Sequence, residues 1–304
     1  GAGCGHAAKV RTSEVGHAQA QHVLVWLDAM PGAAGQGLRH RGVLHRGQER
    51  HRHRHAVARD GRRIRSRCEH LAVATEAITT ARAVKAAGAK ILRGGAYKPR
   101  TSPYEFQGLG KEGLRLLDLA RRETGLKIIT EVLSERDVEH VAATADILQI
   151  GARNAQNFQL LIECAKSGKA VLLKRGMSER IEEWLLAAEY LLAHGNPKVI
   201  LCERGIRTFE TYTRNTLDLA AVAIAKKESH LPVVVDPSQG CGRSDLVTEL
   251  CKGAVALGAD GLLVEVHPNP AEAMSDGQQQ VDFHAFRGLI EGIQPFLHAT
   301  GRTL

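Results

Sequence analysis

The feature that most constrains this fold is a regular alternation of short apolar runs with amphipathic segments, which begins near residue 72. Apolar runs bounded by glycine or proline and separated by helix-like segments are typical of parallel strands covered by helices on both faces. The predicted strands are residues 90–92, 127–132, 147–150, 170–173, 199–202, 233–235 and 262–266. The predicted helices are residues 76–87, 111–124, 135–144, 155–167, 179–193, 216–227, 245–257 and 283–299.

Seven strand–helix units are visible, and the first helix lacks a readable strand before it. Eight such units make a (β/α)8 barrel, an α/β fold of the TIM-barrel type, so the missing first strand is predicted at about residues 59–70. That segment is a poor central strand because it contains five arginines. Burying an unpaired charge costs several kcal/mol. We therefore predict a TIM barrel with a poorly formed first strand.

The positive charge of the chain is confined to its beginning. The 304 residues include 41 Lys and Arg against 33 Asp and Glu, a net charge of +8, and residues 1–66 alone account for it with 12 basic and four acidic side chains. Residues 67–304 are neutral overall, which argues against a general affinity for nucleic acid. The absence of an apolar run of 18 residues excludes a membrane span. The remaining composition is that of an ordinary globular protein.

We predict two parts, an Arg/His-rich segment over residues 1–66 that is irregular or disordered, and a barrel domain over residues 67–304. Eight of the 15 histidines lie in the first part, where Glu49 is followed by an alternation of arginine with histidine over residues 50–55. Three interpretations stay open for this run: solvated low-complexity chain, a tail that binds metals or polyanions, and a stretch outside the native reading frame. Six cysteines without paired spacing predict a reducing, cytoplasmic location.

Basic residues follow several of the predicted strands. In a barrel of this type the active site lies at the carboxyl ends of the strands, and four of these ends carry Arg or Lys. Four cationic ends on one rim indicate a pocket for phosphates and carboxylates. Asp236 and Glu265 end the last two strands, either as ion-pair partners of the arginines or as ligands of a divalent metal.

Several long motifs then resemble one family. They are ILRGGAYKPRTSPYEFQGLG (91–110), TEV (130–132), QIGARN (149–154), LLKRG (172–176), LCERGIRTFE (201–210), VVVDPS (233–238) and LLVEVHPNPAEAMSDGQQ (262–279). Over about residues 72–300 the chain resembles 3-deoxy-D-arabino-heptulosonate-7-phosphate (DAHP) synthases of the microbial type related to 3-deoxy-D-manno-octulosonate-8-phosphate synthase. The resemblance implies a metal-dependent transferase that condenses phosphoenolpyruvate with erythrose 4-phosphate, the first step of the shikimate pathway to aromatic amino acids. An octulosonate-type enzyme is the alternative within this group.

The resemblance also implies roles for individual residues. Phosphoenolpyruvate is assigned to Arg93, Lys98, Gly151, Ala152, Arg153, Lys174 and Arg204. Erythrose 4-phosphate is assigned to Pro99, Arg100, Thr101 and Ser102. Lys98 is the expected proton donor to the aldehyde oxygen, and Glu131 is expected to position water or a cationic partner.

For the divalent metal, Mn²⁺ or a similar ion, the resemblance implies four ligand positions: Glu265, Asp276, Gln239 where the family has histidine, and Cys68 without the Gly-Pro that precedes the family's cysteine. A neutral amide is a weaker ligand than imidazole, so we expect reduced metal affinity. Cys241, His267 and His70 are alternative ligands.

Two hypotheses follow for the activity. One is a working synthase with a weakened or altered metal site. The other is a barrel that binds phosphorylated ligands without efficient turnover. In both cases the expected partners are the two small substrates and, by resemblance, further copies of the chain in a homo-oligomer.

Overall fold

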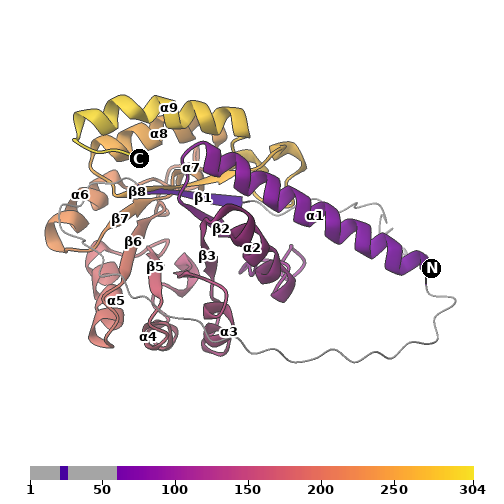
Figure 1. Ribbon diagram of the computed structural model, residues 1–304. Coiled ribbons are helices and arrows are strands. Elements are labelled where there is room, and N and C mark those ends of the chain that lie inside the picture. The colour runs from indigo at the N-terminus through magenta and orange to yellow at the C-terminus, as the bar shows by residue number, and fades with distance from the viewer. Residues whose placement is uncertain (1–20, 27–59) are drawn as a thin grey trace, which may run out of the picture.

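The computed structural model describes residues 21–26 and 60–304, with side chains described for Val25 and residues 73–304. Seven strands run parallel and pair in chain order to form a curled sheet, and helices cover its outer face (Figure 1). This confirms the predicted alternation of strands and helices. The strands are β2 (Ile91–Gly94), β3 (Lys127–Glu131), β4 (Ile147–Ile150), β5 (Ala170–Lys174), β6 (Val199–Glu203), β7 (Val233–Val235) and β8 (Gly261–Val266).

The helices pack outside this sheet, with α8 against α9 and α1 against both α2 and α9 (Figure 1). Within residues 60–304, no helix is both long and apolar enough to cross a membrane. The α-helices are α1 (Asp60–Ala86), α2 (Lys111–Thr124), α3 (Val138–Ala142), α4 (Phe158–Lys166), α5 (Ile181–Ala193), α6 (Leu219–Glu228), α7 (Pro237–Cys241), α8 (Ser244–Ala256) and α9 (Phe283–Ala299). Short 3-10 turns are η1 (Glu135–Asp137), η2 (Ala152–Asn154), η3 (Pro270–Glu272) and η4 (Gly277–Gln279).

The strand that closes the barrel differs from the predicted one. β1 (Gln21–Trp26) lies between β2 and β8 and pairs antiparallel with both. The prediction of a parallel first strand at about residues 59–70 is wrong, because the described part of that segment, from Asp60, belongs to α1. Arginine has a high helix propensity, and a helix satisfies its backbone hydrogen bonds internally, so this stretch need not join a buried sheet. The barrel thus has seven parallel strands and one antiparallel strand among the described residues.

β1 comes from within the segment for which the sequence predicts irregular structure. The remainder of residues 1–59, including the Arg/His run, lies outside the described residues. The boundary at residue 66 therefore stays a prediction.

Two helices begin three residues later than the sequence predicts, at positions where a side chain caps the first turn. Helix α4 begins at Phe158 because Asn157 accepts a hydrogen bond from the Leu160 amide, at 3.2 Å. Helix α6 begins at Leu219 because Asp218 accepts from the Ala221 amide, at 3.1 Å. Asn and Asp stabilise a helix start in this way, but many positions compete for that role in a sequence.

The hydrophobic core has two layers, one on each side of the sheet. Because successive side chains of a strand point to opposite faces, alternate residues divide between the barrel interior and the helices. The interior cluster includes Ile91, Ile129, Ile147, Leu172, Ile200, Val234 and Leu263. Their strand neighbours Leu92, Ile128 and Leu148 belong to the outer cluster. On each strand, the residue two positions after a member of the interior cluster therefore also faces the interior, at the carboxyl end of the strand.

Replacing Leu148 by alanine tests this outer layer. Leu148 is fully buried, so Leu148→Ala should lower the free energy of unfolding by about 2–5 kcal/mol through lost burial and a cavity. Leu186→Ala is the control, because that side chain is 55% exposed, and should change stability by less than about 0.5 kcal/mol. Denaturant titration of both variants measures the difference. Equal effects would contradict the described packing.

Candidate active site

A layer of charged and polar side chains lies above the interior apolar cluster. It follows from the two-residue alternation of the strands, since each member comes two or four residues after an interior apolar residue. All of its members are buried. They are Arg93, Glu131, Gln149, Lys174, Arg204, Asp236 and Glu265.

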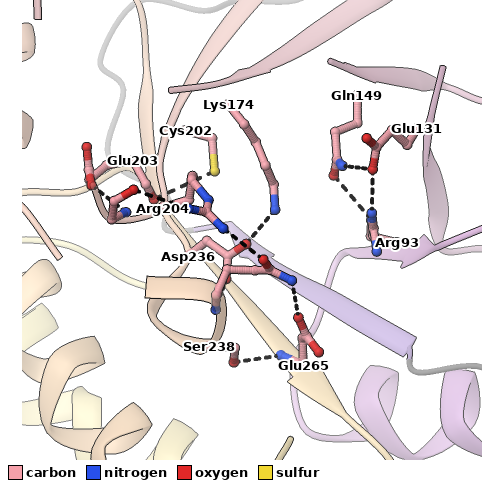
Figure 2. Close-up of polar contacts among 12 residues, drawn as sticks. Arg93, Glu131, Gln149, Lys174, Cys202, Glu203, Arg204, Asp236, Ser238 and Glu265 are labelled. Carbon is pink, nitrogen blue, oxygen red and sulfur yellow. Dashed lines mark hydrogen bonds and ion pairs between the residues drawn. The ribbon is translucent and has the colours of Figure 1, made fainter. Parts of the chain in front are cut away.

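Three of these side chains, from neighbouring strands β2, β3 and β4, form a closed triangle (Figure 2). Arg93 Nη2 donates to Glu131 Oε2 at 3.1 Å, and Arg93 Nε donates to Gln149 Oε1 at 3.2 Å. Gln149 Nε2 in turn donates to Glu131 Oε2 at 3.0 Å. The guanidinium is therefore held in one orientation by a carboxylate and an amide. This leaves Arg93 fixed before any ligand arrives.

Lys174 and Arg204 are held on the opposite side of the same layer (Figure 2). Lys174 Nζ donates to Asp236 Oδ2 at 2.6 Å, and Arg204 Nη2 donates to Gln239 Oε1 at 3.0 Å. Asp236 Oδ1 also accepts from the Gln239 amide, at 3.0 Å, at the start of α7. The carboxylate of Asp236 thus orders both the lysine and the turn that carries Gln239.

A buried ion cluster supports the loop that follows β6. Arg175 Nη1 donates to Glu203 Oε2 at 3.0 Å and to Asp218 Oδ2 at 2.9 Å. Glu203 Oε1 accepts from the Gly205 amide at 2.6 Å. Burial raises the pKa of Glu203, and the attraction of Arg175 acts in the opposite direction. The cluster holds the backbone on both sides of Arg204, so it determines where that guanidinium lies.

Lys98 enters the site from the loop between β2 and α2. Its Nζ donates to Ser275 Oγ at 2.6 Å. Burial lowers the pKa of Lys98 to about 8, an effect opposed by Glu265 and increased by Arg93. The loop doubles back through a hydrogen bond from the Lys98 amide to the Gln107 carbonyl, at 2.9 Å. A buried lysine with a pKa near 8 can release its proton at ordinary pH.

The mouth of the site is lined by further cations. Arg100 Nη1 lies 3.5 Å from Asp276 Oδ2, and Arg214 Nη1 lies 3.2 Å from Asp276 Oδ1. Asp276 has a φ of 58°, a left-handed conformation that Asp adopts more readily than most residues. Arg153 Nη2 donates to Thr101 Oγ1 at 3.2 Å. The rim therefore joins loops that follow four different strands.

Together these residues surround one cavity, whose empty volume of about 610 Å³ includes open solvent at its mouth. Seven basic side chains line it against two carboxylates, Glu131 and Asp276. Such an excess of fixed positive charge attracts anions that carry more than one charge. The basic residues are Arg93, Lys98, Arg100, Arg153, Lys174, Arg204 and Arg214.

Comparison with known proteins identifies the family. A sequence model of the DAHP synthetase I family matches residues 71–294. The chain belongs to the DAHP synthetase I family. It is 56% identical over 222 residues to a phospho-2-dehydro-3-deoxyheptonate aldolase from Thermotoga maritima, a match that covers 73% of this chain and 66% of that protein. The chain thus spans slightly less than two thirds of that relative's length.

Other members of this group are similar at lower or comparable identity. A 2-dehydro-3-deoxyphosphooctonate aldolase from Paraburkholderia phymatum is 35% identical over 223 residues, covering 67% of this chain and 77% of that protein. The crystal structure of the Thermotoga maritima DAHP synthase has a TM-score of 0.73 at 54% identity, covering 75% of this chain and 67% of that one. A truncated form of that synthase has a TM-score of 0.71 at 52% identity, covering 75% and 83%.

In this member of the DAHP synthetase I family, nearly all of the predicted substrate-binding residues lie at the cavity. The seven residues assigned to phosphoenolpyruvate all line it, as do Pro99 and Arg100 from the sugar-phosphate motif. Thr101 contacts Arg153 at the rim, whereas Ser102 accepts a hydrogen bond from the Tyr104 amide within its own loop. Their roles in binding stay predictions.

Two lining residues are absent from the predicted set. Arg214 lies ten residues beyond Arg204 in the long β6–α6 loop. Because it does not directly follow a strand, the strand pattern gave no reason to select it. Gln149 begins the QIGARN motif. Because it lies two residues after the interior Ile147, strand alternation alone could have predicted that its side chain faces the interior. Both residues matter because each holds a predicted site residue in place.

The predicted metal ligands do not form a divalent-cation site in the part of the chain whose side chains are described. No group of three His, Cys, Asp or Glu side chains there could hold a metal ion. Gln239 Nε2 donates to Glu265 Oε1 at 2.9 Å, so the amide presents a proton to the carboxylate. Asp276 is paired with Arg100 and Arg214. Cys68 falls in α1, and its side chain lies outside the described residues.

The alternative ligands have other partners. Cys241 Sγ contacts the Arg243 carbonyl at 3.2 Å, and burial raises the pKa of its thiol. His267 Nε2 lies 3.2 Å from Glu76 Oε1, and its Nδ1 accepts from the Asn269 amide. His70 lies in α1 beyond the described side chains. The donor set as described therefore does not fit the metal that the resemblance implies.

Substitution of Gly151 tests the Arg93 triangle. A Cβ at this position would lie 2.1 Å from Glu131 Oε1, so Gly151→Ala must push the carboxylate away from Arg93. We expect inorganic phosphate to bind about tenfold more weakly by calorimetry, the loss of roughly one charge-assisted hydrogen bond. Gly288→Ala, where nothing lies within 4 Å, is the control and should bind as the parent does. Unchanged binding in Gly151→Ala would show that the triangle does not orient Arg93 for anions.

Proposed function

We propose that this chain condenses phosphoenolpyruvate with erythrose 4-phosphate to give 3-deoxy-D-arabino-heptulosonate 7-phosphate and phosphate. The observation that carries the proposal is that seven basic side chains line one cavity. One phosphate ester would not require so many cations, but two phosphorylated substrates, one with an additional carboxylate, would. Membership of the DAHP synthetase I family supports the same reaction.

The cations form two groups at different depths, which supports a separate place for each substrate. Arg93, Lys174 and Arg204 are buried and held by carboxylate or amide partners. In this proposal they bind the phosphate and carboxylate of phosphoenolpyruvate. Arg100 and Pro99 line the cavity and, with Thr101 and Ser102 of the same loop, are proposed to take the sugar phosphate. Fixed guanidinium groups orient both reactants as well as attract them.

Lys98 is the proposed proton donor. The methylene carbon of phosphoenolpyruvate bonds to the aldehyde carbon, and the aldehyde oxygen becomes a hydroxyl by taking one proton. Water then adds to C2 of phosphoenolpyruvate, and the C2–O bond to phosphate breaks as the C2 carbonyl forms. One proton of the water restores Lys98, and the other leaves on the phosphate. A lysine with a pKa of about 8 is an effective acid for this step because its proton affinity is close to the working pH. Glu131 keeps Arg93 in position and provides a carboxylate beside the reacting groups.

The family is generally metal-dependent, but the donor set described above does not fit a divalent ion, so the proposed steps use only the side chains of this chain. The four cysteines with described side chains are free and buried, which supports the proposed cytoplasmic location. A homo-oligomer is proposed on the same family grounds, and the two substrates are the proposed small-molecule partners.

Turnover by purified protein tests the proposal. The loss of phosphoenolpyruvate absorbance should depend on erythrose 4-phosphate, and Lys98→Met should lower kcat at least about 100-fold, the usual contribution of a general acid. Lys227→Met, an exposed lysine of α6, should retain the parent rate. Phosphoenolpyruvate binding without turnover, with or without Mn²⁺, would instead favour a ligand-binding barrel.

The pH profile gives an independent test of Lys98. Its ammonium form is the active one, so kcat/KM should fall as pH rises through about 8, approaching tenfold for each further pH unit. Lys98→Arg should lose this limb, because a guanidinium stays protonated throughout that range. A parent profile that stays flat above pH 9 would exclude Lys98 as the acid.

A further inference from the structure

We propose that the Gln239 carboxamide takes the place of a divalent cation in this site, by joining Arg204 to Glu265, and that the described residues of the cavity form no Mn²⁺ site of micromolar affinity. One part of the inference rests on the proposed function: the condensation should proceed without added metal. It is carried by three sets of contacts, around Gln239, Glu265 and Asp276.

The first set fixes the orientation of the Gln239 side-chain amide. Gln239 Oε1 accepts from Arg204 Nη2 at 3.0 Å, and its Nε2 donates to Glu265 Oε1 at 2.9 Å. A guanidinium only donates and a carboxylate only accepts, so a flipped amide would oppose both neighbours. The edge of Gln239 that faces Glu265 is therefore an N–H. A cation cannot share that edge, because it would meet a hydrogen atom of the same sign.

The backbone that carries Gln239 is also fixed. Its amide donates to Asp236 Oδ1 at 3.0 Å, and its carbonyl accepts from Asn215 Nδ2 at 3.0 Å. Asp236 is fully buried and also holds Lys174. Moving Gln239 away from Glu265 would thus disturb a hydrogen-bonded turn at the start of α7. The amide bridge is built into the turn.

The second set surrounds Glu265. Besides Gln239, the fully buried Gln279 donates from Nε2 to the same Oε1 atom, at 2.7 Å. The Lys98 ammonium is close enough to be attracted by this carboxylate. Hydrogen bonds to a charged group are stronger than those between neutral groups. A metal ion at this oxygen would have to displace two of them and approach a cationic neighbour.

The third set concerns Asp276, the other acidic candidate. Its two oxygens face the guanidinium groups of Arg100 and Arg214, at 3.5 and 3.2 Å. A divalent ion bound here would be repelled by both arginines, or would have to break both pairs. Asp276 thus faces positive charge from the chain itself, and Glu265 Oε1 accepts from two amide N–H groups. Lys98, which is attracted to both acids, is placed to polarise the aldehyde oxygen without a metal ion.

The direct test is a Mn²⁺ titration of the full chain, with free Mn²⁺ followed by electron paramagnetic resonance. We expect the cavity to bind Mn²⁺ with a Kd weaker than about 1 mM, so the parent and Glu265→Gln should give the same titration. Gln239→His removes the amide and places an imidazole beside the Glu265 carboxylate, so it should bind Mn²⁺ at least about tenfold more tightly. Gln294→His, the same change at an exposed position of α9, should behave as the parent. Micromolar binding by the parent that Glu265→Gln abolishes would overturn the inference.

Turnover after dialysis against a chelator provides the second readout. The parent should retain its rate within about twofold, and added Mn²⁺ should not increase it. A rate lost on chelation and restored by Mn²⁺ would overturn the inference while upholding the proposed function. Absence of turnover in every condition would overturn the proposed function, and the Mn²⁺ titration would still decide the role of Gln239.

Gln239→Leu separates positioning from general stability. This variant removes both hydrogen bonds, so Arg204 loses its partner and the KM for phosphoenolpyruvate should rise about tenfold, while kcat changes by less than about threefold. A residue with only a structural role would lower the folded fraction without raising KM. An unchanged KM would therefore argue against the amide bridge.

Discussion

The site depends on compensation of buried positive charge at one end of an apolar barrel. Arg93, Lys174 and Arg175 are each less than 6% exposed, and each has a carboxylate partner within about 3 Å. Removing one partner of such a pair leaves an uncompensated buried charge, at a cost of about 3–5 kcal/mol. The partners come from other strands, so the charge pairs also hold the carboxyl ends of the strands in register around the cavity.

These pairs make the cavity ready for anions. Because each buried cation is already oriented, a phosphate or carboxylate can bind without ordering flexible side chains first. The same compensation explains how residues 67–304 are neutral overall while the cavity is strongly positive. Lys98 differs from the other cations, since burial brings its pKa close to neutral and thereby suits it to give up a proton.

The carboxylates of the site form two classes by what they contact. Glu131 and Asp236 are bonded to cations that line the cavity, and they order those cations. Glu265 accepts from two amides, and Asp276 faces two guanidinium groups. A single change of residue type at position 239, relative to the histidine that the family resemblance implies, replaces a ligand atom with an N–H donor. Local chemistry on a shared barrel can thus differ without any change in the surrounding strands.

The sequence by itself determined the seven parallel strands and most of the cationic cavity, because both depend on local pattern: apolar runs such as residues 147–150, and basic residues directly after them. Tertiary structure decided the rest. The antiparallel closure by β1, the Arg214–Asp276 pair and the Lys98–Ser275 hydrogen bond join segments far apart in the chain. The orientation of the Gln239 amide likewise depends on which donor and acceptor flank it in space, and no spacing along the chain encodes that choice.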